Sequence, residues 1–167
     1  MAQWIAIGVL ALCVAGLWAY ASTRAPRSAL DKLEIIELAH RYAQGVDRLD
    51  RDLLATAFAA DAVAHYKVVG DAPYELDEHL DGFDAIYGWL SAALSHRGDA
   101  TPWHFMSTPI VELDGGEARM RVFMHNRPLD GVGVYTMDAV RTPAGWRIRK
   151  LQLEERALGH HEAGGSS

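Results

Sequence analysis

A histidine stands near the start of the segment TPWHFMSTPIV, residues 101–111, which has the composition and alternation of a strand. Alternation divides the segment into two faces, one with His104, Met106, Thr108 and Ile110 and the other with Trp103, Phe105, Ser107 and Val111. Both faces are largely apolar, so His104 is expected to be at least partly buried. Such a histidine is either a core residue with one bonded ring nitrogen or a group that accepts a proton in a reaction. The spacing leaves both interpretations open.

An aspartate, Asp47, follows five residues after Tyr42, where an amphipathic helix is expected to end. A carboxylate at the carboxyl end of a helix opposes the helix dipole, so another interaction should hold it there. It is either a turn residue, solvated or capping the next helix, or the partner of His104. As a partner it would orient the imidazole and stabilise its charged form, so that the ring could take a proton from carbon.

The rest of the sequence predicts the elements that position these residues. Apolar residues at three- and four-residue intervals predict a helix that starts at Ser28 or Asp31 and ends near Gly45. The remaining predicted elements are a short helix within 47–61, a strand at 62–69, a polar loop at 70–81, a helix at 82–95, and strands at 102–113, 117–127, 132–141 and 145–155. This order predicts an α+β fold, a cone-shaped curved antiparallel sheet covered by about three helices, with one natural pocket.

The amino-terminal segment differs from the rest of the chain. Residues 4–21 contain no charged side chain and carry a tryptophan near each end, which predicts a membrane anchor over residues 1–22. Ala19-Tyr20-Ala21 resembles a signal-peptide cleavage site, which is the alternative. Because Arg24 and Arg27 follow the apolar run, an anchor would leave the domain in the cytoplasm. Residues 23–30 are expected to be a linker, 31–157 the folded domain and 158–167 a disordered tail.

Composition excludes several kinds of protein. Sixteen Lys and Arg against 22 Asp and Glu give a net charge of -6, and the basic residues are scattered, which argues against a nucleic-acid surface. Cys13 is the only cysteine, so no disulfide can form within the chain. No histidine pair has the HExxH spacing of a helical zinc site, and neither a metal nor a cofactor is expected.

Three stretches resemble the SnoaL-like branch of the nuclear-transport-factor-2-like superfamily, which includes polyketide cyclases, scytalone dehydratase and a dehydrochlorinase. They are residues 35–63, 104–122 and 133–148. The resemblance implies that Asp47 and His104 are catalytic and that Tyr42 polarises a substrate oxygen. It also implies a pocket arginine at Arg141, for which a solvated strand-end charge is the alternative. Thr108 stands where the family usually has Asn, and Met137 where many relatives have Asp.

Together these features predict a cofactor-independent lyase or isomerase acting on a small hydrophobic substrate. The expected lining of the pocket is Met106, Trp89, Phe58, Tyr135, Tyr66 and Met137. The alternative is a ligand-binding or assembly module that uses the same cone without catalysis. A homodimer is expected through the outer face of the sheet, where Trp103, Phe105 and Val111 would supply apolar area.

Overall fold

The computed structural model describes residues 2–97, 103–127 and 131–158, and gives the backbone alone for residues 2–12, 15, 17 and 19–26. The chain divides into two units, residues 1–33 and 34–167. The expected tail lies outside the described residues except for Leu158, which is in neither a helix nor a strand.

The first unit is helical and continues into the second as helix α1, Ala2–Arg48. Residues 23–30, predicted to be a linker, lie within this helix, and the boundary between the two units falls between Leu33 and Glu34. Within the part of the chain that the structure describes, no helix is both long enough and apolar enough to cross a membrane. The anchor over residues 1–22 stays a prediction, because most of its side chains lie outside the described residues.

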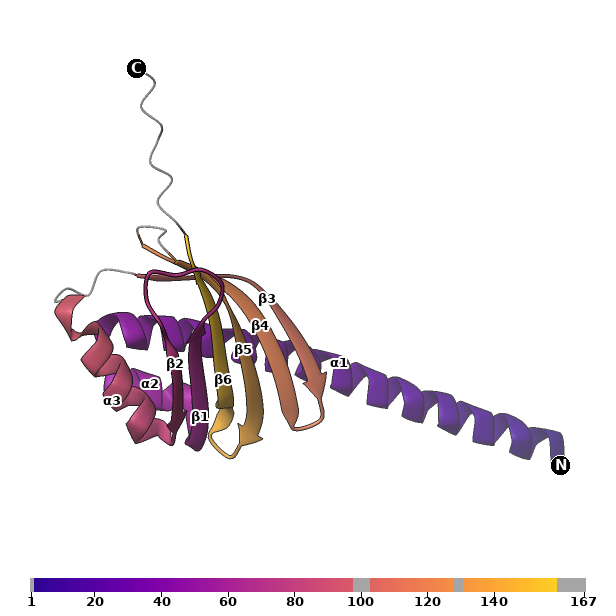
Figure 1. The fold of residues 1–167 in the computed structure, drawn as a ribbon. Helices are drawn as coiled ribbons and strands as arrows, with labels where there is room; N and C mark the ends of the chain where they lie inside the picture. Colours follow the sequence, from indigo (N-terminus) through magenta and orange to yellow (C-terminus); the bar gives the residue numbers. More distant parts are fainter. Residues whose placement is uncertain (1, 98–102, 128–130, 159–167) are drawn as a thin grey trace, which may run out of the picture. The chain divides into compact units, whose positions relative to one another are not determined.

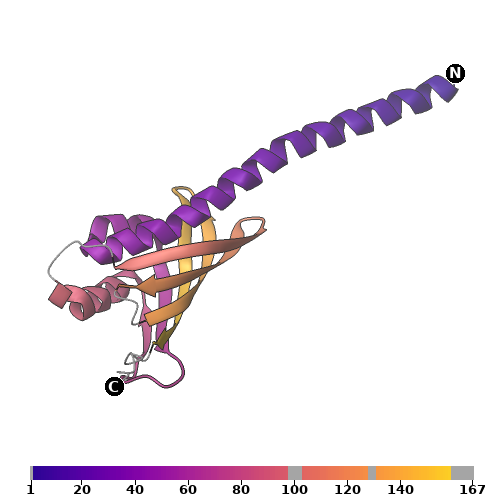
Figure 2. The same ribbon diagram turned by 90° about the horizontal axis from the view of Figure 1, so that it is seen from above.

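The second unit is built on a six-stranded sheet in the order β2-β1-β6-β5-β4-β3 (Figure 1). The sheet curves, and the end of α1 lies along its inner side together with α2 and α3 (Figures 1 and 2). The predicted α+β fold is therefore confirmed. The strands are β1 Phe58–Val68, β2 Asp77–Asp81, β3 His104–Asp114, β4 Glu117–Asn126, β5 Gly131–Thr142 and β6 Gly145–Ala157, and the short helices are α2 Arg51–Ala57, α3 Phe83–Leu94 and the 3-10 helix η1 Ser95–Arg97.

The sheet differs from the prediction at its β1–β2 edge. Strand β1 begins at Phe58, inside the segment predicted as the second helix, and pairs in parallel with β6, so the sheet is mixed rather than wholly antiparallel. The predicted loop 70–81 contains β2, which pairs antiparallel with β1. Four of the five β2 residues are charged or histidine. Such side chains keep an exposed edge strand from pairing with another chain, but they also leave no alternation of apolar and polar residues that would predict a strand.

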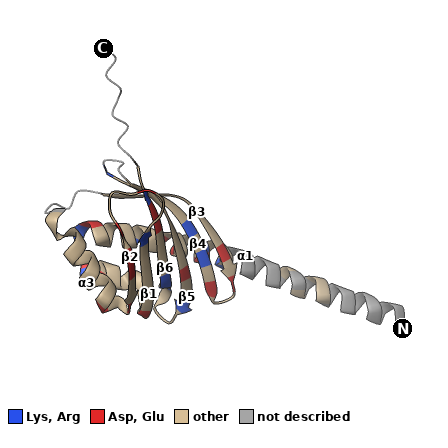
Figure 3. Cartoon of the chain, viewed as in Figure 1, with Lys and Arg blue, Asp and Glu red and all other residues tan. Residues whose placement is uncertain are grey.

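Alternate residues of the strands face inward and form one core with α1. Met120 and Val122 of β4 and Leu151 of β6 belong to the same buried cluster as Leu38 and Val46 of this helix. The outward residues of the same strands are mostly polar, and charges of both signs are spread over them (Figure 3). The inner face of the sheet is therefore apolar and buried, and its outer face is charged.

A bulge interrupts the alternation of β3. Thr108 and Pro109 lie opposite Val122 alone, and Thr108 has φ 48°. The extra residue reverses the face of the sheet to which each later side chain of β3 points. Ile110 is therefore 66% exposed, and Val111 packs against the core. The prediction that Ile110 faces inward and Val111 outward was therefore wrong. Thr108 itself is exposed.

Helix α1 ends in a tight turn that fixes the position of Asp47. Leu49 adopts φ 51°, its amide donates to the Val46 carbonyl at 3.2 Å, and the amide of Asp50 donates to the Gly45 carbonyl at 2.9 Å. This is the double hydrogen bond of a Schellman motif. The Asp50 carboxylate then accepts from the Leu53 amide at 2.9 Å and caps α2.

Candidate functional site

Asp47 and His104 meet, as expected, although 57 residues separate them. Asp47 Oδ1 lies 2.7 Å from His104 Nδ1, and Asp47 Oδ2 accepts the backbone amides of Trp103 at 2.8 Å and His104 at 3.2 Å. The side chains are only 7% and 10% exposed, respectively. The end of α1 and the first residues of β3 thus hold one carboxylate by three hydrogen bonds, which leaves it little freedom to rotate.

The environment keeps Asp47 ionised. Burial alone would raise the pKa of this carboxyl, but the hydrogen bonds from His104 and from the Trp103 amide outweigh burial and lower the pKa below its usual value. An ionised carboxylate only accepts, so His104 Nδ1 carries the proton of this hydrogen bond. In the neutral ring Nε2 is then an acceptor, and it has no hydrogen-bond partner among the described residues.

Three buried tyrosine hydroxyls lie close to one another. The Tyr42 hydroxyl donates to Tyr66 at 3.3 Å and lies 3.2 Å from the Tyr135 hydroxyl. Burial raises the pKa of all three phenols well above the ordinary value, so they stay protonated. Because Tyr42 has one proton and gives it to Tyr66, Tyr135 must donate to Tyr42. The Tyr66 proton then has no acceptor within the described chain.

The residues expected to line a pocket gather around these tyrosines. Tyr42 makes edge contacts with Phe58, His104 and Tyr135, at ring-centroid distances of 6.0, 6.5 and 5.2 Å. Trp89 of α3 stacks on Tyr66 at 4.7 Å. Met106 packs against the same core, and Met137 is fully buried in it. The described side chains of this group pack as part of the core.

Arg141 does not join this group. It is an exposed residue near the end of β5, with its guanidinium 4.7 Å above the Trp146 ring and its backbone amide on the Gly116 carbonyl. Gly116 lies in the β3–β4 turn, whereas His104 begins β3, so the length of this strand separates Arg141 from His104, roughly 30 Å. The structure thus does not bring Arg141 together with His104, and its implied role as a pocket arginine stays a prediction.

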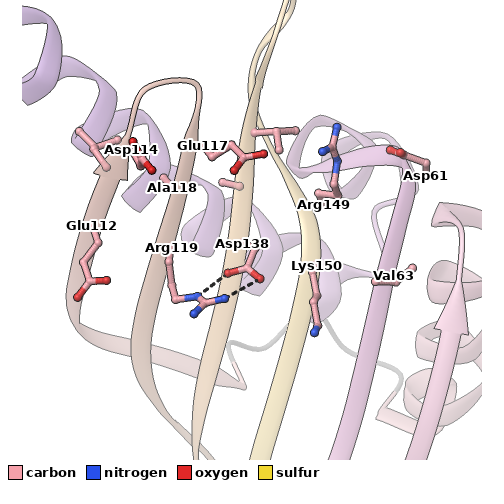
Figure 4. A pocket seen from close by; sticks show the side chains of 13 residues that line it. Asp61, Val63, Glu112, Asp114, Glu117, Ala118, Arg119, Asp138, Arg149 and Lys150 are labelled. Atoms are coloured by element: carbon pink, nitrogen blue, oxygen red, sulfur yellow. Dashed lines mark hydrogen bonds and ion pairs between the residues drawn. The ribbon is translucent and has the colours of Figure 1, made fainter.

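A hollow lies on the outer face of the sheet. It has a volume of about 800 Å³, and acidic and basic side chains from β1, β3, β4, β5 and β6 line it (Figure 4). Arg119 donates to both carboxylate oxygens of Asp138 at 2.7 and 3.2 Å inside it. Neither this hollow nor two smaller ones, of about 520 and 230 Å³, includes Asp47, His104 or Tyr42. The charged side chains that line the hollow of about 800 Å³ do not suit the hydrophobic substrate that the sequence predicts.

A second group of titratable side chains lies where β1 pairs with β2. His65, Asp77 and His79 each offer a ligand atom, and these atoms all lie within 4.8 Å of one another. The prediction of no metal rested on the absence of a histidine pair with HExxH spacing, which describes a zinc site on a helix and not one on paired strands. The sequence feature that could have indicated the cluster is the pair Asp77 and His79, two potential metal ligands at positions i and i+2. This spacing is informative only if β2 is predicted to be a strand.

Solved structures share the fold. A protein of unknown function from Mycobacterium tuberculosis, Rv3472, superposes with a TM-score of 0.65 at 19% identity, over 81% of this chain and 78% of that one. A protein from Novosphingobium aromaticivorans described as a candidate scytalone dehydratase has a TM-score of 0.57 at 19% identity, over 77% and 86% of the two chains. An NTF2-like protein with a cystatin-like fold from the same genus and species has a TM-score of 0.57 at 26% identity, over 83% and 89%. The chain thus has the NTF2-like fold.

Sequence comparison narrows the class to a family. Residues 27–152 match the model of the SnoaL-like domain. The chain is also 32% identical to the uncharacterised protein Rv2910c of Mycobacterium tuberculosis over 129 residues, which are 71% of this chain and 80% of that protein. The chain belongs to the SnoaL-like family.

Proposed function

We propose that this protein is a cofactor-independent lyase or isomerase in which His104 removes a proton from a carbon atom of a small, mostly apolar substrate. The observation that carries the proposal is the buried Asp47–His104 pair, in which the carboxylate fixes the Nδ1–H tautomer and leaves Nε2 to accept. Asp47 would also balance the positive charge that the ring gains. Membership of a family that includes enzymes supports a catalytic role.

The tyrosine cluster supplies the electrophilic side of the proposed reaction. Removing a proton from carbon next to a carbonyl places negative charge on the oxygen, which needs a hydrogen-bond donor. Tyr66 is buried and has a proton without an acceptor in the described chain, and a buried unsatisfied donor costs on the order of 1–3 kcal/mol. A substrate oxygen would satisfy it. Tyr42, implied by the family resemblance as the polarising residue, would act through its hydrogen bond to Tyr66.

The substrate class follows from these two groups. It has an acidic C–H bond and, beside it, an oxygen that can accept from a phenol, on a skeleton that tolerates Met106, Phe58 and Trp89 as neighbours. Loss of a β-leaving group from the carbanion gives a lyase, and return of the proton at another carbon gives an isomerase. Both reactions begin with the same abstraction.

Exchange of carbon-bound hydrogen tests the abstraction directly. A panel of aryl ketones and β-hydroxy ketones is incubated in D2O with the protein, and deuterium uptake at carbon is followed by NMR. The wild type should catalyse exchange, His104→Gln should lower the rate at least 100-fold, and Tyr66→Phe should lower it by a smaller factor. His40→Gln, at an exposed histidine of α1, is the matched control. Exchange by His104→Gln at the wild-type rate would exclude the proposed base.

A non-catalytic module remains the second candidate, favoured by one observation. Tyr42, Tyr66, Tyr135 and Met137, all expected beside the substrate, are buried in the hydrophobic core and at most 1% exposed. In this case Asp47 and His104 would tie α1 to β3, and the cone would hold a ligand or support an assembly. Saturable binding of the same ketones without any exchange would favour this candidate.

A further inference from the structure

The cluster His65, Asp77 and His79 lies on the outer face of the sheet at the β1–β2 edge. His65 Nε2 is 2.6 Å from Asp77 Oδ1, and His79 Nε2 is 3.5 Å from the same oxygen. The two imidazole rings stack with centroids 3.7 Å apart at 21°. The side-chain exposures are 22% for His65, 73% for Asp77 and 70% for His79. One carboxylate oxygen is thus shared by two imidazoles at an accessible edge.

Strand register brings the three residues together. His65 and His79 are direct cross-strand partners, and Asp77 precedes His79 by two residues on the same face of β2. Tyr66, the next residue of β1, faces the core. The cluster is therefore on the opposite side of the sheet from the tyrosine hydroxyls, and the strand backbone separates the two sites.

We propose that His65, Asp77 and His79 form a Zn²⁺ site in which each residue gives one ligand. Two imidazole nitrogens and a carboxylate oxygen are ligands that zinc commonly takes in tetrahedral sites with one open position. With metal–ligand bonds of about 2.0–2.1 Å, neighbouring tetrahedral ligand atoms lie about 3.3 Å apart. The His79–Asp77 separation of 3.5 Å is close to this value.

When the metal enters, the His65–Asp77 separation must lengthen and the two stacked rings must turn so that both Nε2 atoms point at the ion. At 2.6 Å the His65–Asp77 contact is a hydrogen bond, and zinc would replace the proton between the two atoms. Asp77 can make this adjustment because its side chain is exposed on an edge strand. Asp47, held by two backbone amides in addition to His104, cannot move in the same way.

A hollow beside the cluster leaves room for a fourth zinc ligand, and an ion pair reduces the repulsion between zinc and a nearby lysine. A hollow of about 230 Å³ adjoins the cluster, lined by His65, His79, Asp81, Lys150 and Gln152 among others. Water or a small anion there would complete the coordination. Lys67, directly opposite Asp77 on β1, forms an ion pair with Glu154 at 2.8 Å, which partly neutralises this cation.

Zinc at this position would fasten β2 to the sheet. Strand β2 has five residues and pairs with β1 alone, so a metal that links Asp77 and His79 to His65 joins the edge strand to its neighbour. Any ligand that binds only the folded state raises its stability. Zinc should therefore raise the melting temperature of the protein.

Titration of the full chain with ZnCl2 tests the site, with calorimetry for affinity and thermal unfolding for stability. His160 and His161 are adjacent in the tail and could chelate zinc, so the titration uses a tag-free chain with His160→Ala and His161→Ala. One saturable zinc ion per chain is expected at pH 7.5, with a higher melting temperature. His79→Ala and Asp77→Asn should each weaken binding at least tenfold and abolish the thermal shift. His40→Gln, beside the exposed Glu37, is the matched control and should bind as the parent does.

Two outcomes would overturn the proposal: no saturable binding in the tail-substituted chain, or binding unchanged by His79→Ala. His79 is exposed, so its replacement should leave the fold intact, and circular dichroism verifies this. Cobalt in place of zinc should give the visible absorption of a tetrahedral site, and this absorption should be lost in the same variants. His104→Gln must retain zinc binding, which separates this test from that of the proposed catalysis.

Discussion

The molecule contains two histidine–aspartate pairs with nearly the same contact and opposite surroundings. Asp47 and His104 lie 2.7 Å apart with side chains 7% and 10% exposed, whereas Asp77 and His65 lie 2.6 Å apart with side chains 73% and 22% exposed. Backbone amides bind the first carboxylate, and a second imidazole shares the second one. The contact alone therefore does not define what a histidine–aspartate pair can do.

The difference lies in how far each carboxylate can move and what else it can bind. The remaining oxygen of Asp47 is occupied by two backbone amides, so the pair is fixed and suits an oriented base. Asp77 is at an exposed edge, and two imidazole nitrogens approach one oxygen, which suits a cation. A rigid pair favours proton transfer, and a movable pair with a second histidine favours a metal.

The largest expected effect comes from neutralising the two aspartates in turn. Asp47→Asn replaces a buried acceptor of three hydrogen bonds by an amide and should cost about 2–4 kcal/mol of unfolding free energy at pH 7. Asp77→Asn should cost much less without zinc, because exposed ion pairs contribute little. Urea unfolding of both variants measures the contrast. Equal losses would mean that burial does not distinguish the pairs.

Lowering the pH should reduce the stability difference between the wild type and Asp47→Asn. The pKa of Asp47 is lowered in the folded protein, so its contribution is present above the pKa of the unfolded chain and is lost as pH falls through the folded value. The stability difference between wild type and Asp47→Asn should therefore shrink below about pH 4. A difference that stays constant down to pH 2 would show that the charge of Asp47 does not stabilise the fold.

The next effect concerns the turn that positions Asp47. A Cβ atom on Gly45 would lie 2.6 Å from Leu54 Cγ and 3.2 Å from the Leu54 amide nitrogen, and Leu54 is fully buried. Gly45→Ala should therefore destabilise by about 1–3 kcal/mol, despite the better helix propensity of alanine. Gly88→Ala, at an exposed position of α3 with nothing within 4 Å, is the matched control and should stabilise by up to about 1 kcal/mol. Thermal unfolding compares them, and a stabilising Gly45→Ala would exclude a tight α1–α2 contact.

The two pairs also differ in how far the sequence could predict them. The helix ending at Asp47 and the family resemblance together predicted the contact with His104. The cluster at His65 and His79 could not be predicted, because it depends on the cross-strand register of β1 and β2 and the charged composition of β2 had indicated a loop. Elements with a clear apolar period, such as α3 and β4–β6, were predicted within a few residues.

The other differences between the sequence-based prediction and the structure arise from a bulge and from strand register. The bulge at Thr108 reverses the faces of Ile110 and Val111, and nothing in a period-two pattern indicates an inserted residue. Arg141 could be matched to a family position by spacing alone, but the β5 register places it beside the β3–β4 turn. Residue type was sufficient for the core, whereas register decided the placement of polar groups.

A smaller effect should appear in self-association, which would cover part of the outer face away from the histidine cluster. Phe105, Ile110 and Phe123 are 41%, 66% and 54% exposed on β3 and β4, and we propose that they form the contact of a homodimer. Ile110→Asp should lower the dimer fraction at micromolar concentration in light scattering. Leu33→Asp, at an exposed leucine of α1, is the control. A monomeric wild type would exclude the dimer.

The smallest expected effect is at Thr108, whose φ of 48° is costly for a β-branched residue. Asn tolerates this left-handed conformation better than a β-branched residue does. Thr108→Asn should therefore raise the unfolding free energy by about 0.5–1 kcal/mol, while Thr108→Val, which keeps the branching, should give no gain. Thermal unfolding of both variants measures this. Because Thr108 is exposed, the substitution touches neither histidine–aspartate pair, so zinc affinity and exchange rates should not change. A loss of stability in Thr108→Asn would mean that the hydroxyl or methyl group of Thr108 compensates for the strained backbone.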